Sequence, residues 1–337
     1  MTLEFKPNSD YPLYLCLLWL VLLTSCKKEP VSFITLEGQA QGTTFQITYE
    51  DSLRQDYSVE VDSLFKLIDK SMSLWDTSSL ISRINRNDST AIPDEHFINV
   101  FRKAREISEY TGGAFDMTVG PLVKAWGFSR KNIGPPPDSF AIDSLLKITG
   151  YRKVRIQDGR IKKEDPRIAL DFNAIAQGYT VDLIAAFLRS RGVDNYLVEI
   201  GGELMARGKN QRNMTWQVGI DKPVDSLAEG RPLQTTISLQ DKALATSGSY
   251  RKYIMKDGKK LSHVIDPGSG YPMNQNLLSV SVIAEDCATA DAYATAFLVL
   301  GIEKAMVIAK EKGLEIFCIY ADDSGNFQTV ATPGFSR

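Results

Sequence analysis

Apolar residues change their spacing along the chain, and the change divides it near residue 151. Before that point they recur at intervals of three and four, first from Val61 to Met72 and then from Phe97 to Ile107, which predicts amphipathic helices. After it, and also at 31–36 and 43–49, short alternating stretches bounded by turn residues predict strands. The predicted strands are 31–36, 43–49, 153–157, 160–163, 168–170, 196–199, 216–220 and 234–239, and further helices are predicted at 138–148, 174–191 and 287–300.

The order of these elements predicts an α+β fold. Helices and strands do not alternate strictly, which disfavours a doubly wound parallel sheet. Because helices dominate the N-terminal half and strands the C-terminal half, we expect a helical N-terminal half packed with a mainly antiparallel sheet.

A continuous apolar run at residues 13–23 breaks the globular pattern. It is shorter than the roughly 20 residues needed to span a bilayer, and it has the length of a signal-peptide core. The run ends in Leu23-Thr24-Ser25-Cys26, which resembles the bacterial lipobox, where cleavage precedes an acylated cysteine. We therefore expect a lipoprotein signal peptide at 1–25, an anchor linker at 26–32 and one folded domain at 33–337. A signal peptide without lipidation and a buried core helix are the alternatives.

Composition and charge narrow the class of partner. With 39 basic and 41 acidic residues the net charge is −2, and no long basic run is present, so nucleic acid is an unfavourable partner. An apolar content of 43% excludes a disordered or fibrous chain. If Cys16 leaves with the signal and Cys26 carries the anchor, Cys287 and Cys318 remain, and their apolar contexts predict two buried free thiols.

Common catalytic signatures are absent from the sequence, which has no phosphate-binding P-loop, no Gly-x-Gly-x-x-Gly, no Cys-x-x-Cys and no His-Glu-x-x-His. The most specific local pattern is Asp291 with Thr295, because residues four apart share one helix face. Alternate neighbours from 288 to 296 are alanines, which leave room for a ligand. A carboxylate and a hydroxyl suit a hard cation such as Mg²⁺, although both side chains could instead cap or bond within an alanine-rich core helix.

One of the two histidines also stands in a chemically suggestive place. His263 precedes Val264-Ile265-Asp266-Pro267 at an expected junction of strand and turn. A loop histidine near an aspartate can act as a general acid or base near neutral pH. It can equally be a hydrogen-bonded turn residue.

Taken together, these segments resemble the ApbE-like flavin transferases over nearly the whole mature chain. The resemblance rests on motifs that occur in the family's order. They are Gly42-Thr43-Thr44-Phe45, Met72-Ser73-Leu74-Trp75, 79–85, Gly112-Gly113-Ala114-Phe115-Asp116, 119–123, 126–128, 171–179 with Asp182, Ile200-Gly201-Gly202-Glu203, Ala245-Thr246-Ser247-Gly248, 263–267 and 290–295.

The resemblance implies an FAD:protein FMN transferase with an FAD cleft between two lobes. Such an enzyme passes the FMN half of FAD to a Thr, or sometimes Ser, hydroxyl of an acceptor protein and releases AMP, with Mg²⁺ at the diphosphate. Acceptors would resemble redox subunits of the Na⁺-pumping quinone reductase or of Rnf-type complexes. The enzyme would sit in the bacterial cell envelope, lipid-anchored to the inner or outer membrane and facing the periplasm.

The resemblance also implies a role for individual residues. Asp291 and Thr295 would be Mg²⁺ ligands, joined by the backbone carbonyl of Ala174, while His263, oriented by Asp266, would accept the acceptor's proton or stabilise the phosphoryl group. The positions implied to contact FAD are Gln41, Trp75, Ala114, Phe115, Asp116, Asp171, Gln177 and Ile265.

Several positions depart from the family pattern. Trp75 stands where Tyr is common, Gln41 where Met is frequent, and Gln177 where Lys is usual, so one positive charge near the phosphates or the flavin is lost. None of these changes removes an implied metal ligand. Two other functions stay open at this level: an FAD pyrophosphatase that uses water in place of the Thr hydroxyl, and a flavin-binding lipoprotein without activity.

Overall fold

The structure, a computed structural model, describes residues 1–4, 32–129, 135–224, 232–249, 253–256, 259–274 and 276–335. The apolar run at 13–23 and the predicted lipidation site Cys26 lie outside these residues.

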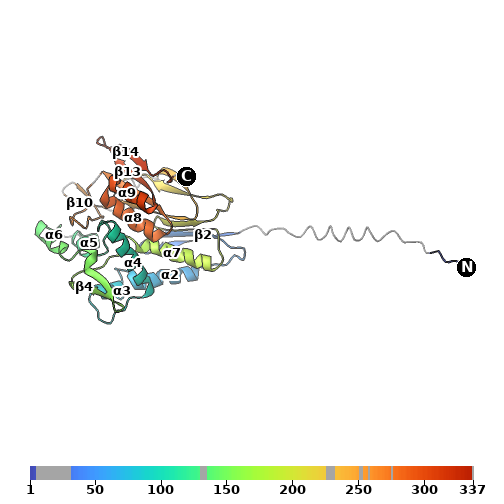
Figure 1. The fold of residues 1–337 in the computed structure, drawn as a ribbon, viewed down its shortest axis with the longest axis horizontal. Coiled ribbons are helices and arrows are strands. Elements are labelled where there is room, and N and C mark those ends of the chain that lie inside the picture. Colours follow the sequence, from blue (N-terminus) through green and yellow to red (C-terminus); the bar gives the residue numbers. More distant parts are fainter. Residues whose placement is uncertain are drawn as a thin grey trace.

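One antiparallel sheet organises the described part of the chain (Figure 1). Each strand pairs antiparallel with its neighbours, and in the register Phe45 lies opposite Ile200 while Val282 lies opposite Ala245. In spatial order, the eight strands found there are β1 (Phe33–Ala40), β2 (Thr43–Glu50), β5 (Tyr196–Ile200), β6 (Glu203–Arg207), β9 (Lys242–Gly248), β12 (Leu277–Ala284), β13 (Glu315–Ala321) and β14 (Phe327–Ala331).

The two faces of this sheet bury different partners. Successive side chains of a strand point to opposite faces, and in β6 Met205 packs into a cluster with α2 and α7 while Leu204 and Ala206 pack against the β7–β8 ribbon. Helices thus cover one face and a two-stranded ribbon covers the other. The helices are α2 (Ser58–Met72), α4 (Glu95–Tyr110), α7 (Ala176–Ser190), α8 (Cys287–Leu300) and α9 (Ile302–Lys312), and the ribbon is β7 (Trp216–Asp221) with β8 (Leu233–Leu239).

Shorter elements complete the helical side and the loops around it. A small cluster of Leu122, Trp126, Ile142 and Ile265 joins α5 and α6 to the loop after β11. These elements are α3 (Leu80–Asn85), α5 (Gly120–Ala125), α6 (Ser139–Leu146), a 3₁₀ turn (Tyr151–Lys153), the hairpin β3 (Val154–Gln157) with β4 (Arg160–Lys163), and the hairpin β10 (Tyr253–Lys256) with β11 (Lys259–Ser262).

The α+β prediction is confirmed, and so are the paired first strands, the helices near 174–191 and 287–300, and the two free thiols. Cys287 and Cys318 are both buried, and neither forms a disulfide. Burial raises the pKa of Cys318 to about 12 and that of Cys287 well above its usual range, so both thiols stay protonated and inert.

The predicted strand at 168–170 is wrong. The backbone of this segment pairs with a side chain: Leu170 N donates to Asn85 Oδ1 at 2.7 Å, and Asn85 Nδ2 donates to Leu170 O at 2.9 Å. Asn85 thereby replaces a neighbouring strand, and no ladder forms.

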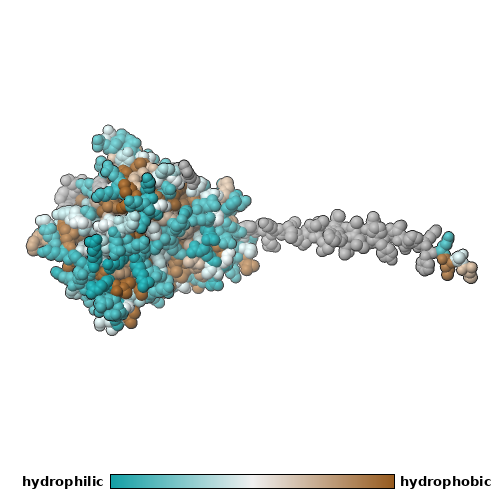
Figure 2. Space-filling model, in the orientation of Figure 1, coloured by the Kyte–Doolittle hydropathy of each residue, from teal (hydrophilic) through white to brown (hydrophobic). Residues whose placement is uncertain are grey.

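None of the helices in the described ranges is both long and apolar enough to span a membrane. Figure 2 shows a mainly hydrophilic face on which apolar side chains occur as separate spots.

Candidate functional site

The candidate site lies where α7 and α8 cross near their N-termini. Gly178 on α7 lies directly against the start of α8, so that a Cβ added there would be 2.4 Å from Cys287 O and 2.9 Å from Ala288 Cα. A glycine inside a helix weakens it, and this one is explained by close approach of the partner backbone. Because residue 178 has no side chain, the polar residues of α8 can lie close to the first turn of α7.

Asp291 and Thr295 both lie on α8 at this crossing, one helical turn apart as their spacing predicts. Asp291 is buried, at 7% exposure, and its Oδ2 accepts a hydrogen bond from Gly178 N at 3.2 Å. One turn further along, Thr295 Oγ1 lies 2.9 Å from Ser247 Oγ of β9. The two candidate ligands are therefore held from both sides, by α7 and by the sheet.

The chemistry of this pair fits a magnesium ion. Burial raises the pKa of the Asp291 carboxyl, while the hydrogen bond from Gly178 opposes the rise, so a nearby cation would favour the charged form. Across the described residues, no group of three or more His, Cys, Asp or Glu side chains could hold a metal. A site of one carboxylate, one hydroxyl and a carbonyl suits Mg²⁺, which usually leaves its other positions to water and phosphate.

Two tight turns lie beside the start of α7. The β5–β6 turn brings Gly201 next to Gln177, whose Nε2 is 2.8 Å from the point where a Cβ on Gly201 would stand; the positive φ of Gly201, 66°, also favours glycine. Gln41, in the β1–β2 turn, donates from Nε2 to Thr180 Oγ1 at 2.9 Å. Its Oε1 is buried and has no hydrogen-bond partner among the described residues.

Asp171 lies beside the residue that follows the predicted segment 114–116, since Asp171 N donates to Met117 O at 2.8 Å. Phe115 is part of the core. The Asp116 carboxylate accepts hydrogen bonds from Thr118 N, Thr118 Oγ1 and Tyr151 N, so its visible role is to hold this loop. Burial raises the pKa of Asp116 and of Asp171.

His263 directly follows β11, at the strand end that the sequence predicts. Its ring meets that of Phe128 edge to face, with the centroids 6.5 Å apart. Ile265 is buried against Trp126, whose Nε1 donates to Gly270 O at 2.8 Å. The Asp266 carboxylate closes the following turn by accepting from Gly268 N and Ser269 N, a structural role that the sequence analysis did not anticipate.

Trp75 differs from the other candidates because it is 73% exposed. It follows α2, and its backbone N donates to Ser73 Oγ at 3.3 Å. A large aromatic ring left in water is available to stack on a planar ligand.

A hollow of about 930 Å³ connects two of the predicted segments. One side is formed by residues 112–114 after α4 and the other by Asp266 and Gly268. Val299 and Leu300 of α8 complete part of its wall, one to two turns beyond Thr295. The helix that carries the candidate metal ligands thus also borders this hollow.

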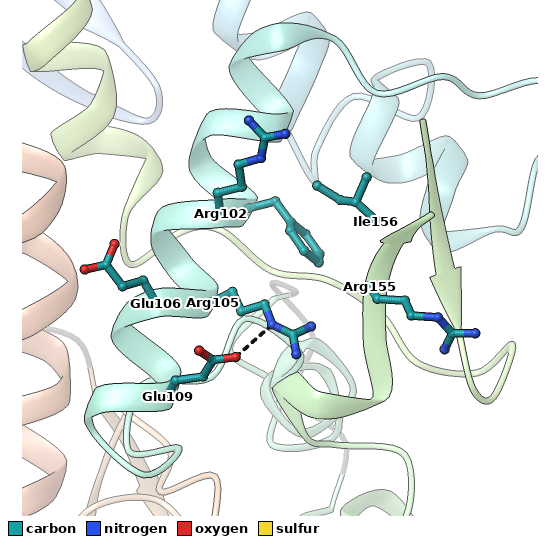
Figure 3. A pocket seen from close by; sticks show the side chains of 7 residues that line it. Arg102, Arg105, Glu106, Glu109, Arg155 and Ile156 are labelled. Atoms are coloured by element: carbon teal, nitrogen blue, oxygen red, sulfur yellow. Dashed lines mark hydrogen bonds and ion pairs between the residues drawn. The ribbon is translucent and has the colours of Figure 1, made fainter. Parts of the chain in front are cut away.

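A second hollow, of about 570 Å³, lies apart from the predicted residues, between α4 and β3 (Figure 3). Arg105 Nε is 2.9 Å from Glu109 Oε1, and its Nη1 donates to Val154 O at 2.8 Å. The Arg105 guanidinium thus already has two acceptors within the protein. This hollow is lined by Phe101, Arg102, Arg105, Glu106, Glu109, Arg155 and Ile156.

Sequence reasoning assigned no role to Ser247 or Gly178, although both lie in quoted motifs. Ser247 contacts Thr295 across a strand and a helix that are distant in sequence. The signal for Gly178 was its place inside an otherwise regular helical pattern, which indicates a close contact.

Replacing Gly178 with alanine should lower both activity and stability. The added methyl would overlap Cys287 O and force α7 and α8 apart, at a cost of about 1–3 kcal/mol or more. We expect a lower melting temperature and at least a roughly tenfold slower reaction, since displacement of ligands by a fraction of an ångström is costly. Ala186→Val, on an exposed position of the same helix, should leave the rate unchanged. Equal rates for Gly178→Ala and wild type would contradict the close-approach argument.

Comparison with known proteins gives a consistent family. The sequence profile of the ApbE family matches residues 41–318. An FAD:protein FMN transferase of Vibrio cholerae serotype O1 is 35% identical over 94% of this chain and 95% of its own length, and that of Escherichia coli K12 is 32% identical over 92% and 90%.

Solved structures agree with the sequence comparison. The flavin transferase ApbE from Vibrio cholerae matches with a TM-score of 0.81 at 33% identity, covering 91% of this chain and 99% of that chain. The apo form of the Pseudomonas stutzeri flavinyl transferase ApbE matches with a TM-score of 0.80 at 30% identity, covering 91% and 96%.

Proposed function

Because the chain belongs to the ApbE family and, like its FAD:protein FMN transferase relatives, moves the FMN part of FAD onto an acceptor protein, we propose that the reaction depends on Mg²⁺ and ends on a threonine hydroxyl. The observation that carries this proposal is the helix crossing, where Asp291 is buried against α7 and Thr295 follows one turn along.

Asp291 and Thr295 would hold the metal with their side chains, and Ala174 would add its carbonyl from the segment before α7. When bound, Mg²⁺ supplies charge neutralisation on the phosphoryl oxygens of FAD. Gln41, with a buried unpartnered acceptor, and Gln177, beside Gly201, would orient the dinucleotide at the same end of α7.

The transfer itself breaks one phosphoanhydride bond and forms one phosphoester bond. The threonine oxygen of the acceptor attacks the phosphorus on the FMN side of FAD, and AMP departs with the bridging oxygen. The threonine proton must leave, and His263, at the end of β11, is our candidate to accept it or to stabilise the phosphoryl group. Phosphoryl transfer relies on positioning and charge more than on a strong protein nucleophile.

The acceptor residue is testable with synthetic peptides. The full-length protein would be incubated with FAD, Mg²⁺ and peptides that carry Asp-Gly-Ala-Thr, the same sequence with Ser, or the same sequence with Ala in place of Thr. We expect covalent FMN on the Thr peptide, slower labelling of the Ser peptide and none on the Ala peptide. Equal labelling of the Ala peptide would exclude the hydroxyl as the target.

We further propose that the enzyme is anchored through lipid on Cys26 to a membrane of the cell envelope and faces the periplasm, where it would modify redox proteins that resemble Nqr or Rnf subunits. Support comes from the sequence, in which an apolar run precedes Leu23-Thr24-Ser25-Cys26. Metabolic labelling with a fatty-acid probe should mark the wild type and not Cys26→Ala; labelling of both would contradict the anchor.

Replacing Trp75 with alanine should weaken FAD binding without unfolding the protein. The ring is largely exposed, so its loss removes a stacking surface and few internal contacts. An aromatic pair contributes about 0.5–1.5 kcal/mol beyond its buried area, which corresponds to roughly a 2–12-fold higher Kd. Trp75→Tyr should bind FAD nearly as well as wild type. Titration by flavin fluorescence measures both; an unchanged Kd for Trp75→Ala would exclude the stacking role.

A further inference from the structure

The first turn of α8 is capped by a residue of another helix. A helix begins with N–H groups that lack partners within it, and these are commonly satisfied by its own N-cap residue. Here Asp286 is that residue and accepts from Thr289 N at 2.9 Å. The two preceding groups, Cys287 N and Ala288 N, donate instead to the two carboxylate oxygens of Asp182 on α7, at 2.7 and 2.9 Å.

This contact is the counterpart of the one made by Asp291. Asp291, on α8, accepts from Gly178 N on α7, and Asp182, on α7, accepts from Cys287 N on α8. Gly178 and Asp182 are four residues apart, as are Cys287 and Asp291, so each pair spans one helical turn. Together, these two hydrogen-bonded contacts fix the position of α8 along α7 and the rotation of α8 about its own axis.

Burial and the nearby Asp286 carboxylate raise the pKa of Asp182 to about 7, while the hydrogen bonds from Cys287 N and Ala288 N and the charge of Lys103 oppose the rise. A carboxylate at a helix N-terminus is stabilised by the partial positive charge of the exposed N–H groups. Lys103 of α4 adds a positive charge beside the same turn, with Nζ 2.8 Å from Asp286 Oδ1 and 2.8 Å from Thr289 Oγ1. Asp182 is therefore held as a two-oxygen acceptor between two helices that both belong to the site.

We propose that Asp182 is a positioning residue for the metal ligands: by holding the start of α8 it places Asp291 and Thr295 relative to the segment before α7. This inference rests on the proposed function, because it concerns the same Mg²⁺ site. Asp182 itself need not touch the ion. Residues that orient metal ligands typically change metal affinity by about 10–100-fold when replaced.

Asp182→Asn tests the proposal, because the amide keeps the size of the side chain and one acceptor but presents an N–H₂ group to one of the two backbone donors. The probe is Mn²⁺, measured by its free-ion electron paramagnetic resonance signal with FAD present and corrected with an FAD-only blank. We expect Mn²⁺ binding about tenfold weaker than in the wild type. At saturating Mg²⁺ the transfer rate should return to within about threefold of wild type, since the displaced ligands are then occupied.

Asp94→Asn is the matched control. Asp94 caps α4 and also accepts two hydrogen bonds, from Phe97 N at 2.8 Å and Ser71 Oγ at 3.0 Å. It should lower the melting temperature about as much as Asp182→Asn and leave Mn²⁺ binding unchanged. If Asp182→Asn does not fold, Asp182→Glu replaces it, with the same expected loss of affinity because the longer side chain shifts α8.

The possible results separate the positioning role of Asp182 from the proposed metal site on which it rests. Mn²⁺ affinity within twofold of wild type in the Asp182 variant, or an equal loss in the Asp94 control, would overturn the positioning role. Failure of the wild-type protein with FAD to bind Mn²⁺ at all would overturn the proposed metal site itself, and with it the inference.

Discussion

Replacing Asp291 with asparagine is expected to slow FMN transfer by at least about 10³-fold. The proposed cation stabilises charge on the reacting phosphate by several kcal/mol, and each 1.36 kcal/mol is a factor of ten in rate. Asparagine keeps an oxygen that can accept from Gly178 N, but it loses the negative charge that would hold the proposed Mg²⁺. The rate would be measured as FMN incorporated into an acceptor peptide across a range of Mg²⁺ concentrations.

The stability of the same variant provides the control. Asp291 is buried, and burial opposes its charge, so the neutral amide should leave the melting temperature unchanged or raise it. If the variant is slow but as stable as the wild type, Asp291 acts in the reaction and not in folding. Unchanged Mg²⁺-dependent turnover in Asp291→Asn would remove Asp291 from the metal site.

Replacing His263 with alanine should lower the transfer rate by about 10²–10⁴-fold, the range that general acid–base groups contribute. His263 lies at the end of β11 and makes an edge-to-face contact with Phe128, and the melting temperature of the variant separates an effect on the reaction from an effect on the fold. The KM for FAD should change much less than kcat, because proton transfer contributes in the transition state and not in substrate binding. Steady-state kinetics with the acceptor peptide separates the two constants.

A second substitution separates the two roles proposed for His263. His263→Lys places a positive charge at this position, but a protonated lysine cannot act as a base. If the side chain stabilises charge, the lysine variant should recover part of the lost rate; if it accepts the proton, the lysine variant should be as slow as alanine. His263→Ala at the wild-type rate would contradict both roles.

The sequence predicted the local parts of this fold well, because local spacing controls them. The alternation at 43–49 and the helical periods near 174–191 and 287–300 correspond to β2, α7 and α8. The order of strands in the sheet was beyond such reasoning, since β2 pairs with β5 across about 150 residues and β9 with β12 across a hairpin and loop. The error at 168–170 has the same origin, because Asn85, far away in sequence, supplies the partner.

The candidate site residues were chosen from two kinds of pattern, residue spacing and family resemblance. The spacing of Asp291 and Thr295 indicated a shared helix face, and the structure has both on α8 with the carboxylate directed at α7. Ser247 and Asp182 could not be found from spacing, because their contacts join elements that meet only in the folded chain. Gln41 was expected from the family pattern, but its buried acceptor without a partner appears only in three dimensions.

The most direct test of the account is the balance of products in one reaction. The wild-type protein would be incubated with FAD, Mg²⁺ and an acceptor peptide that contains threonine, and AMP, free FMN and peptide-bound FMN would be quantified together. The account predicts one AMP for each FMN on the peptide, little free FMN, and loss of both products when Mg²⁺ is removed. AMP matched by free FMN with an unlabelled peptide, or peptide labelling that persists without a divalent metal, would contradict it.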